Sequence, residues 1–378
     1  MNNLASVYGS LNRHIESEPL YKSVLELRQQ RLGQEHPDTL LSMNNLAHCY
    51  QALGRVTEAE TLHQQALEGH TKALGKNHPD TLLSMSNLAE IYRKQNRFAE
   101  AEPLAKKALA GRRHALGDDH PHTLTSFNNL AFLEQSQLHF EEAEPLFRSA
   151  LSGAKQRLGM SHPKTQLYTR NLLAMYQEIN KLDAAEPLLR DLAEVQQQKS
   201  KADSFDYAQA LIPLGVNLIA QRKDAEGTVT LEAAGEILKR DEKAGPASAT
   251  YASFLTQWAE ELLKTQQFEA AEAKFREELT IRQKLSPEGW TVFRVQSLIG
   301  ASLTGQKKFA DAEQLLLSGY AGLSAAESAK KIPAVAKSRP TKALQQLIDL
   351  YIAWDKPEQA AEWQKKLDEL TQAKESTK

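Results

Sequence analysis

The sequence predicts an all-α protein, a solenoid of about nine antiparallel helix pairs stacked along the chain. Three short motifs recur in register at intervals of 42 residues. Asn-Asn-Leu-Ala begins at residues 2, 44 and 128, Leu-Gly-x-x-His-Pro at residues 32, 74, 116 and 158, and Glu-x-Glu at residues 58, 100 and 142. Self-similarity at a fixed period of this length is typical of repeat proteins, in which each repeat packs against its neighbours.

The first helix of each repeat, here called helix A, follows the His-Pro pair. Pro37 suits the first helical position, where its missing N–H costs no hydrogen bond. Beyond it, apolar residues are spaced three, three, one and three apart, which places them on one face of a helix. These residues are Leu40, Met43, Leu46, Ala47 and Tyr50. Gly54, Asn96 and Asn180 share a later repeat position and tolerate the left-handed backbone that ends a helix.

The second helix, helix B, is predicted by another apolar stripe in the same repeat. The stripe consists of Ala59, Leu62, Ala66 and Leu67. Prolines 103, 145 and 187 fall near the start of helix B, where few backbone N–H groups have helical partners. Each repeat is therefore expected to be an antiparallel helix pair.

The repeat resembles the tetratricopeptide repeat, whose small and large packing positions match Leu46, Ala47, Tyr50, Ala59 and Ala66. The ordinary repeat has about 34 residues, whereas the 42-residue form with Leu-Gly-x-x-His-Pro-x-Thr-Leu and Asn-Asn-Leu-Ala is similar to the kinesin-light-chain type. This resemblance implies a right-handed superhelix with helices A on its concave face. Residues 351–363 resemble the C-terminal end of repeat arrays attached to bacterial serine/threonine protein kinases, although no kinase motif is present.

The chain is divided here into five parts, according to how clearly each part shows the repeat motifs. Regular repeats are expected at 1–201, the first of them truncated, and degenerate repeats at 202–326, where the period persists while the motifs fade. A linker or insertion with two prolines is expected at 327–341. A C-terminal capping helix pair follows at 342–370, and residues 371–378 form a tail.

Composition argues against several classes of partner. The 378 residues carry 46 basic and 48 acidic side chains, a formal charge of -2, which does not fit a general binder of nucleic acid or anionic membranes. No stretch approaches the ~18 apolar residues of a membrane span. The single cysteine, Cys49, cannot form an internal disulfide. We therefore expect a cytoplasmic protein with no nucleic-acid, membrane or cofactor partner.

The resemblance implies that helices A line a ligand-binding groove. The positions carried over to this groove are Asn44, Asn45, His48, Asn87, Glu90, Arg93, Lys94, Asn128, Asn129, Phe132, Arg170 and Asn171. A side-chain amide both donates and accepts, so a column of Asn can pair with the backbone of an extended peptide. Arg93, Lys94 and Arg170 would favour acidic side chains in the ligand. In the alternative interpretation, one Asn of each pair hydrogen-bonds the neighbouring helix and fixes the stacking.

No motif points to catalysis or to a metal site. Histidines 36, 78, 120 and 162 lie in equivalent loops, and stacked repeats hold such loops two interhelical distances of ~8–10 Å apart, too far for one zinc ion. They are expected to be structural and could cap helices. The glutamates at the starts of helices B recur at fixed register and are interpreted as solvated carboxylates near the positive end of a helix dipole.

These observations predict a non-catalytic scaffold that binds a protein or an extended peptide in the groove. An alternative is the regulatory or substrate-docking segment of a larger signalling enzyme, such as a bacterial serine/threonine kinase. Leu4 and Val7 would be exposed on the first helix, which predicts weak self-association through the N-terminal repeat.

Overall fold

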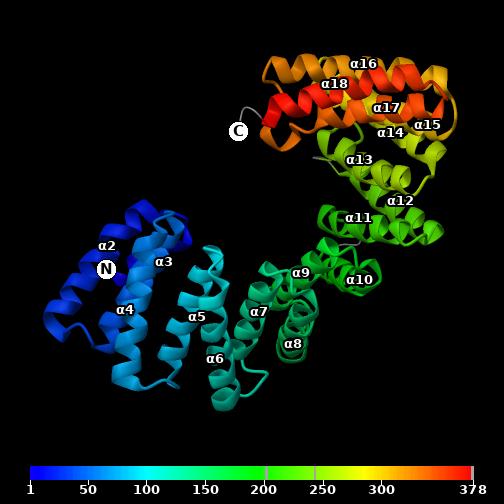
Figure 1. Ribbon diagram of the computed structural model, residues 1–378. Coiled ribbons are helices and arrows are strands. Elements are labelled where there is room, and N and C mark those ends of the chain that lie inside the picture. The colour runs from blue at the N-terminus through cyan, green and yellow to red at the C-terminus, as the bar shows by residue number, and fades with distance from the viewer. Residues whose placement is uncertain (201–202, 242–243, 376–378) are drawn as a thin grey trace. The chain divides into compact units, whose positions relative to one another are not determined.

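The computed structural model describes residues 1–200, 203–241 and 244–375, and these ranges fold into helices joined by short connections (Figure 1). They contain eighteen α-helices, the number that nine two-helix repeats require, and one 3-10 helix, η1 (Ala334–Ala336). The predicted all-α fold is therefore confirmed. We number the repeats in chain order, so that α1 and α2 form repeat 1. Odd-numbered helices are helices A, and even-numbered helices are helices B.

The chain divides into two compact bodies, residues 1–179 and residues 180 onward, and the division falls inside repeat 5. The N-terminal body contains α1 (Asn2–Ser10), α2 (His14–Leu32), α3 (Pro37–Ala52), α4 (Val56–Leu74), α5 (Pro79–Lys94), α6 (Phe98–Leu116), α7 (Pro121–Ser136), α8 (Phe140–Leu158) and α9 (Pro163–Glu178). The C-terminal body contains α10 (Leu182–Lys199), α11 (Phe205–Ala220), α12 (Asp224–Arg240), α13 (Ala249–Lys264), α14 (Phe268–Leu285), α15 (Trp290–Gly305), α16 (Phe309–Ser328), α17 (Arg339–Ala353) and α18 (Pro357–Glu375).

The His-Pro pair of the loop motif starts four helices A. In each case the histidine is the N-cap, and its Nδ1 accepts a hydrogen bond from the backbone N–H two residues later. The distances are 3.2 Å at His36, 3.3 Å at His78, 3.2 Å at His120 and 3.1 Å at His162. The imidazole thus accepts a hydrogen bond from a backbone N–H group of the first helical turn. In most helices a serine, threonine, asparagine or aspartate side chain has this role. The structural role expected for these histidines is confirmed.

Every helix A ends at a residue with left-handed backbone. Gly54, Asn96 and Asn180 have φ values of 76°, 58° and 53°, as the sequence predicts. Asn12 has the same conformation in repeat 1 (φ 59°). It also occurs at the equivalent points of repeats that have neither glycine nor asparagine there, for example at Leu138 (φ 63°) and Arg222 (φ 63°). Packing of the two helices therefore imposes this turn even where the residue itself disfavours it.

Replacing Leu138 with asparagine is expected to stabilise the N-terminal body by about 1 kcal/mol. A left-handed backbone costs a leucine roughly 1–2 kcal/mol, and asparagine tolerates it better. Leu138 is 68% exposed, so the substitution removes little buried apolar surface. Hydrogen exchange of α7 and α8 would measure the gain in stability. Leu167→Asn is the control, because Leu167 is also exposed but lies inside helix α9, where no left-handed backbone is relieved. Equal effects of the two substitutions would contradict this account.

An arginine at the start of helix B joins successive repeats. Arg55 donates to Glu58 of its own helix and to Glu18 of the preceding helix B, the latter at 2.7 Å, and lies 4.2 Å from the ring centre of Tyr50. One repeat later, Arg97 bonds Glu100 and Glu60, both at 2.7 Å, and lies 4.2 Å from the ring of Tyr92. We call this arrangement the arginine clasp. The recurring Glu-x-Glu motif is therefore a bridge between repeats as well as a helix start.

The C-terminal end differs in detail from the sequence-based division. The segment expected as a linker or insertion at 327–341 begins inside α16, and its residues Ile332 and Ala336 are buried against Leu323 and Ala343. Helices α17 and α18 lie at the residues predicted for the capping pair. Residues 371–375 of the expected tail continue α18, and residues 376–378 lie outside the described residues. No helix in the described parts of the chain is both long enough and apolar enough to cross a membrane.

Candidate functional site

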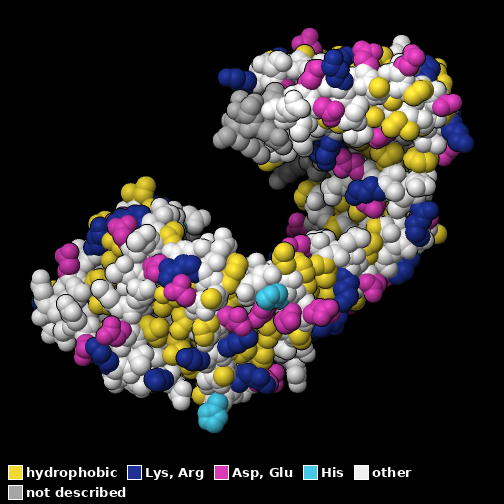
Figure 2. Space-filling view, in the orientation of Figure 1, with side chains coloured by type: hydrophobic (Ala, Val, Ile, Leu, Met, Phe, Trp, Pro, Cys, Tyr) yellow, Lys and Arg dark blue, Asp and Glu magenta, His cyan; other side chains and the backbone are white. Residues whose placement is uncertain are grey.

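The candidate site is the side of the N-terminal body formed by α3, α5, α7 and α9, which we call the A face. Helix α5 packs directly against α7, the next helix A, whereas successive helices B of this body show no comparable packing. Helices α5 and α7 therefore lie closer together than the helices B on either side of them. Figure 2 shows basic and acidic side chains interspersed over the visible face, without a large area of one sign.

Two of the asparagines expected to contact a ligand are buried instead. Asn44 is 2% exposed and donates to Ser84 Oγ at 3.2 Å, while its Oδ1 lies 2.8 Å from Nδ1 of His63. Asn128 is 7% exposed. Because both side chains are enclosed between helices, the prediction that they face a ligand is wrong. The first asparagine of the motif points into the packing between helices.

The second asparagine of the motif bridges adjacent repeats. Asn171 donates to Oδ1 of Asn128 at 2.8 Å, and Asn45 donates to Oδ1 of Asn2 at 3.4 Å, each reaching back 43 residues. These bonds support the stacking interpretation for Asn45 and Asn171. Asn87 is half-buried, and its Nδ2 is buried with no hydrogen-bond partner among the described residues.

The surface of the A face varies at one pair of repeat positions, on helix A and the following helix B. Repeat 2 has His48 against His63, with ring centres 5.1 Å apart and the rings edge to face. Repeat 4 has Phe132 against Phe147 at 5.2 Å in the same arrangement. In repeat 3, however, Glu90 and Ala105 hold these positions. Because alanine replaces a ring there, a small space opens between α5, α6 and α7.

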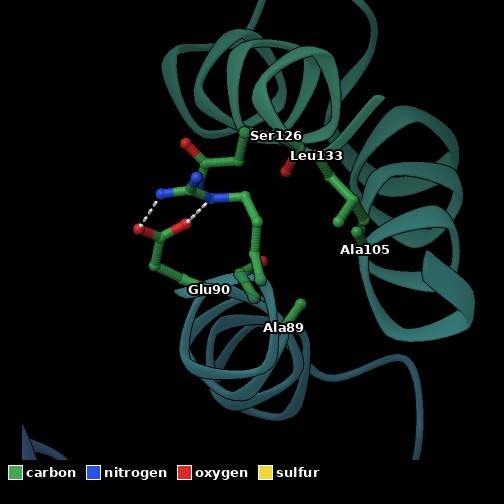
Figure 3. Close-up of a pocket in the computed structure, with 8 residues that line it drawn as sticks. Ala89, Glu90, Ala105, Ser126 and Leu133 are labelled. Carbon is green, nitrogen blue, oxygen red and sulfur yellow. Dashed lines mark hydrogen bonds and ion pairs between the residues drawn. The ribbon is translucent and has the colours of Figure 1, made fainter. Parts of the chain in front are cut away.

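Figure 3 shows this space and the side chains around it. Its volume is about 10 Å³, enough for one water molecule. The side chains around it are Ser86, Ala89, Glu90, Arg93, Ala105, Ser126, Asn129 and Leu133. At its mouth the Arg93 guanidinium donates twice to the Glu90 carboxylate, both at 2.8 Å, and a third time to Ser136 Oγ of the next repeat at 3.1 Å.

The structure brings most of the other predicted residues to the same region. Lys94 lies 3.5 Å from the Glu90 carboxylate, and Phe132 is half-buried with its ring centre 6.0 Å from the Arg93 guanidinium carbon. His48 is exposed on α3. Arg170 is exposed on α9 and donates to Gln166 at 3.4 Å. The A face thus offers a planar, fixed guanidinium beside a half-exposed aromatic ring.

A buried polar network lies beneath the A face in repeat 2. His63 is fully buried between Asn44 and Gln51, at 2.8 and 3.4 Å. Burial, with a smaller effect from His48, lowers the pKa of His63 to about 3, so the imidazole is neutral at pH 7. Nearby, Nδ1 of the buried His70 contacts Ser84 Oγ at 2.9 Å. The network is a stability element whose charge state depends on pH.

One buried carboxylate in the C-terminal body has the environment that acid–base catalysis often uses. Glu278 is fully buried, and burial raises its pKa. It accepts a hydrogen bond from Thr256 at 2.6 Å and lies 3.3 Å from Arg282 and 3.7 Å from Arg294. Because these side chains enclose it, a substrate cannot reach its oxygens in this arrangement, and we interpret it as a structural group.

Sequence reasoning missed Ala105, Ser126 and His63, which shape the A face from below. Residues 63, 105 and 147 occupy one repeat position and read His, Ala and Phe. The alternation between a ring and a methyl group was therefore visible in the aligned repeats. This position faces helix A only if helix B turns that side toward helix A. The apolar stripe alone does not specify which side of helix B does so.

Comparison with known proteins identifies the repeat. The sequence profile described as tetratricopeptide repeat matches residues 1–67, 41–114 and 99–156. No curated protein matches the sequence. Among solved structures, the nearly identical TPR-like repeats of a proposed kinesin light chain of Podosopora anserina are similar, with 28% identity over 53% of this chain and 95% of that one and a TM-score of 0.46. BtubC (BKLC) of P. vanneervenii has 22% identity over 60% and 90% of the two chains and a TM-score of 0.49. Because both scores are below 0.5, the identification of the repeat rests on the profile: residues 1–156 match the tetratricopeptide repeat.

Proposed function

We propose that this chain is a non-catalytic scaffold that binds an extended segment of a partner protein along the A face. The repeat architecture fits a protein-interaction role, because each repeat contacts only its neighbours and leaves a long surface on which contacts add up. The observation that carries the proposal is the Arg93 guanidinium, fixed at the mouth of a small space beside Phe132. A docked carboxylate could replace Glu90 as its partner without loss of bidentate geometry, so acidic ligand segments are favoured.

The asparagines take a different place in this proposal from the one the sequence predicts. Asn45 and Asn171 are engaged with the preceding repeat, so their removal is expected to weaken stacking. Contact with a ligand is assigned to Asn129, which lines the space beside Arg93, and to the half-buried Asn87. The alternative function, a docking segment of a larger signalling enzyme, is an expectation from the sequence alone. Weak self-association through α1 is also an expectation from the sequence alone. Leu4 and Val7 of this helix are 49% and 53% exposed.

Replacing Arg93 with alanine is expected to weaken binding of an acidic partner segment about tenfold or more. Loss of a charge-assisted bidentate contact costs about 1.5–3 kcal/mol, and 1.4 kcal/mol is a factor of ten in affinity. Proteins retained from native lysate by the wild-type chain would be identified, and the affinity of the contacting segment measured for each variant. Arg148→Ala is the matched control, because Arg148 also bonds a glutamate, Glu144, at 2.9 Å, but on helix B α8. Equal affinities of wild type, Arg93→Ala and Arg148→Ala would refute binding at the A face.

A further inference from the structure

A larger cavity lies on the other side of the N-terminal body, between helices B α4 and α6, with α5 as its floor. Its volume is about 540 Å³, within the range of ligand sites. Leu82 and Met85 of α5 form an apolar floor, and Leu67 of α4 lies beside them. Gly111 of α6 lets the floor residue Leu82 pack closely against this helix, since a Cβ there would lie 2.7 Å from Leu82 Cδ2. The cavity is therefore a built feature of the helix packing.

The rim of this cavity is basic. Lys76, Lys107 and His114 line it, and no aspartate or glutamate is among its lining residues. Within the described part of the chain, neither Lys76 nor Lys107 forms an ion pair. Lysines of the flanking helices do form ion pairs: Lys72 of α4 pairs with Glu68 at 2.9 Å and Lys106 of α6 with Glu102 at 2.5 Å. We call this cavity the lysine-rimmed pocket.

The preceding repeat provides a natural comparison. There α2, α3 and α4 form an equivalent cavity of about 240 Å³, whose floor is Leu40 and Met43 and whose bare wall is Gly69. Its rim differs, with Glu35 and Glu68, three glutamines and Lys72. The floor is thus a common feature of the packing, while the positive rim belongs to the pocket between α4 and α6.

In the following repeat the equivalent space is covered. Phe127 stands in place of Met85 and is 6% exposed. Arg113, in place of Thr71, has its guanidinium carbon 5.5 Å from the centre of that ring, and Asp118, in place of Lys76, holds Arg113 at 2.7 Å. Among the lining positions that differ between these neighbouring repeats, these three place a ring, a guanidinium and a carboxylate where the lysine-rimmed pocket is open.

We propose that the lysine-rimmed pocket is a second binding site, which takes a bulky apolar side chain of a partner protein segment flanked by carboxylates. The apolar floor supplies burial for the anchoring side chain, and the two unpaired lysines supply partners for acidic neighbours. An uncharged segment would leave both lysines unpaired, and a basic one would be repelled. The site is on the helix B side, so it is independent of the A face, and the chain can hold two segments at once.

The decisive test closes the pocket with residues that the next repeat already uses. The closed variant combines Thr71→Arg, Lys76→Asp and Met85→Phe. A displayed library of random twelve-residue peptides would be selected on the full wild-type chain, and the enriched peptides synthesised. We expect leucine, phenylalanine or tryptophan beside aspartate or glutamate, at least tenfold weaker binding to the closed variant, and unchanged binding to Arg93→Ala. Binding to the closed variant within twofold of wild type, or no such enrichment, overturns the proposal and leaves binding at the A face untouched.

A reciprocal variant tests whether the assigned residues suffice. It opens the covered space between α6 and α8 by Arg113→Thr, Asp118→Lys, Phe127→Met, Ser149→Lys and Gln156→His, each copied from the equivalent position of the lysine-rimmed pocket. Titration calorimetry with an enriched peptide is expected to give two bound peptides per chain instead of one. A stoichiometry of one for the variant folded by circular dichroism contradicts the assignment. If the variant does not fold, the closed variant decides alone.

Discussion

Replacing Phe147 with alanine is expected to lower the local free energy of unfolding around α7 and α8 by about 3–5 kcal/mol. Phe147 is fully buried, and its ring meets Phe132 edge to face at 5.2 Å. Truncation removes its apolar contacts and leaves a cavity that rigid neighbouring helices fill only in part. Hydrogen exchange of peptides from α7 and α8 measures the loss directly, without assuming that the array unfolds in one step.

The matched control for this substitution is Phe132→Ala. Phe132 contributes the other ring of the pair but is only half-buried, so its truncation is expected to cost less than half as much. It also removes an aromatic surface from the A face, whereas Phe147 is inaccessible there. If both variants lose the same stability, the packing assigned to α8 is incorrect.

Lowering the pH from 7 to 5 is expected to destabilise repeats 2 and 3 by about 2 kcal/mol. The folded protein holds the pKa of His63 at about 3, below the ordinary 6.5. The unfolded chain therefore binds a proton first, so stability is complete above pH 6.5 and is lost as pH falls toward 3. The stability lost is roughly 1.4 kcal/mol for each pH unit below the ordinary pKa, and pH 5 is about 1.5 units below it, which gives the loss of about 2 kcal/mol. Burial also lowers the pKa of His70, which adds to the loss.

The test of this acid sensitivity replaces the histidine pair with the pair of repeat 4. His48→Phe with His63→Phe copies Phe132 and Phe147, the ring pair of repeat 4. Hydrogen exchange of α3 and α4, corrected for intrinsic rates, would be compared at the two pH values. The variant is expected to lose clearly less stability than wild type. The same loss in both proteins would assign the sensitivity to other groups.

The parts of the fold that depend on single residues were predictable from the sequence. The His-Pro helix starts and the left-handed turns at Gly54 and Asn96 follow from local backbone chemistry, which acts the same way in each repeat that carries these residues. The choice between Asn44 and Asn45 did not follow. Neighbouring helical positions differ by about 100° around the axis, and both lie near the edge of the apolar stripe. Only packing of the next repeat decides which of them is enclosed.

The binding surfaces were less predictable for a related reason. The lysine-rimmed pocket depends on residues of three helices and one turn, among them Lys76 of the turn between α4 and α5, Met85 of α5 and Lys107 of α6. None of these residues stands out in its own segment of the sequence. The pocket becomes visible only when α4 and α6 are placed side by side over α5, because the relation between Lys76 and Lys107 is set by tertiary packing.

The arginine clasp ends after repeat 3. At the start of α8 the position of Arg55 and Arg97 is taken by His139, which pairs with Glu134 at 3.1 Å instead of reaching the preceding helix B. The links between successive repeats are therefore chemically unequal: an arginine joins the helices B of repeats 1 to 3, whereas repeats 3 and 4 are joined through helices A, by Arg93 with Ser136 and by α5 against α7. Tension along the array would therefore load helices B at the first junctions and helices A at the next.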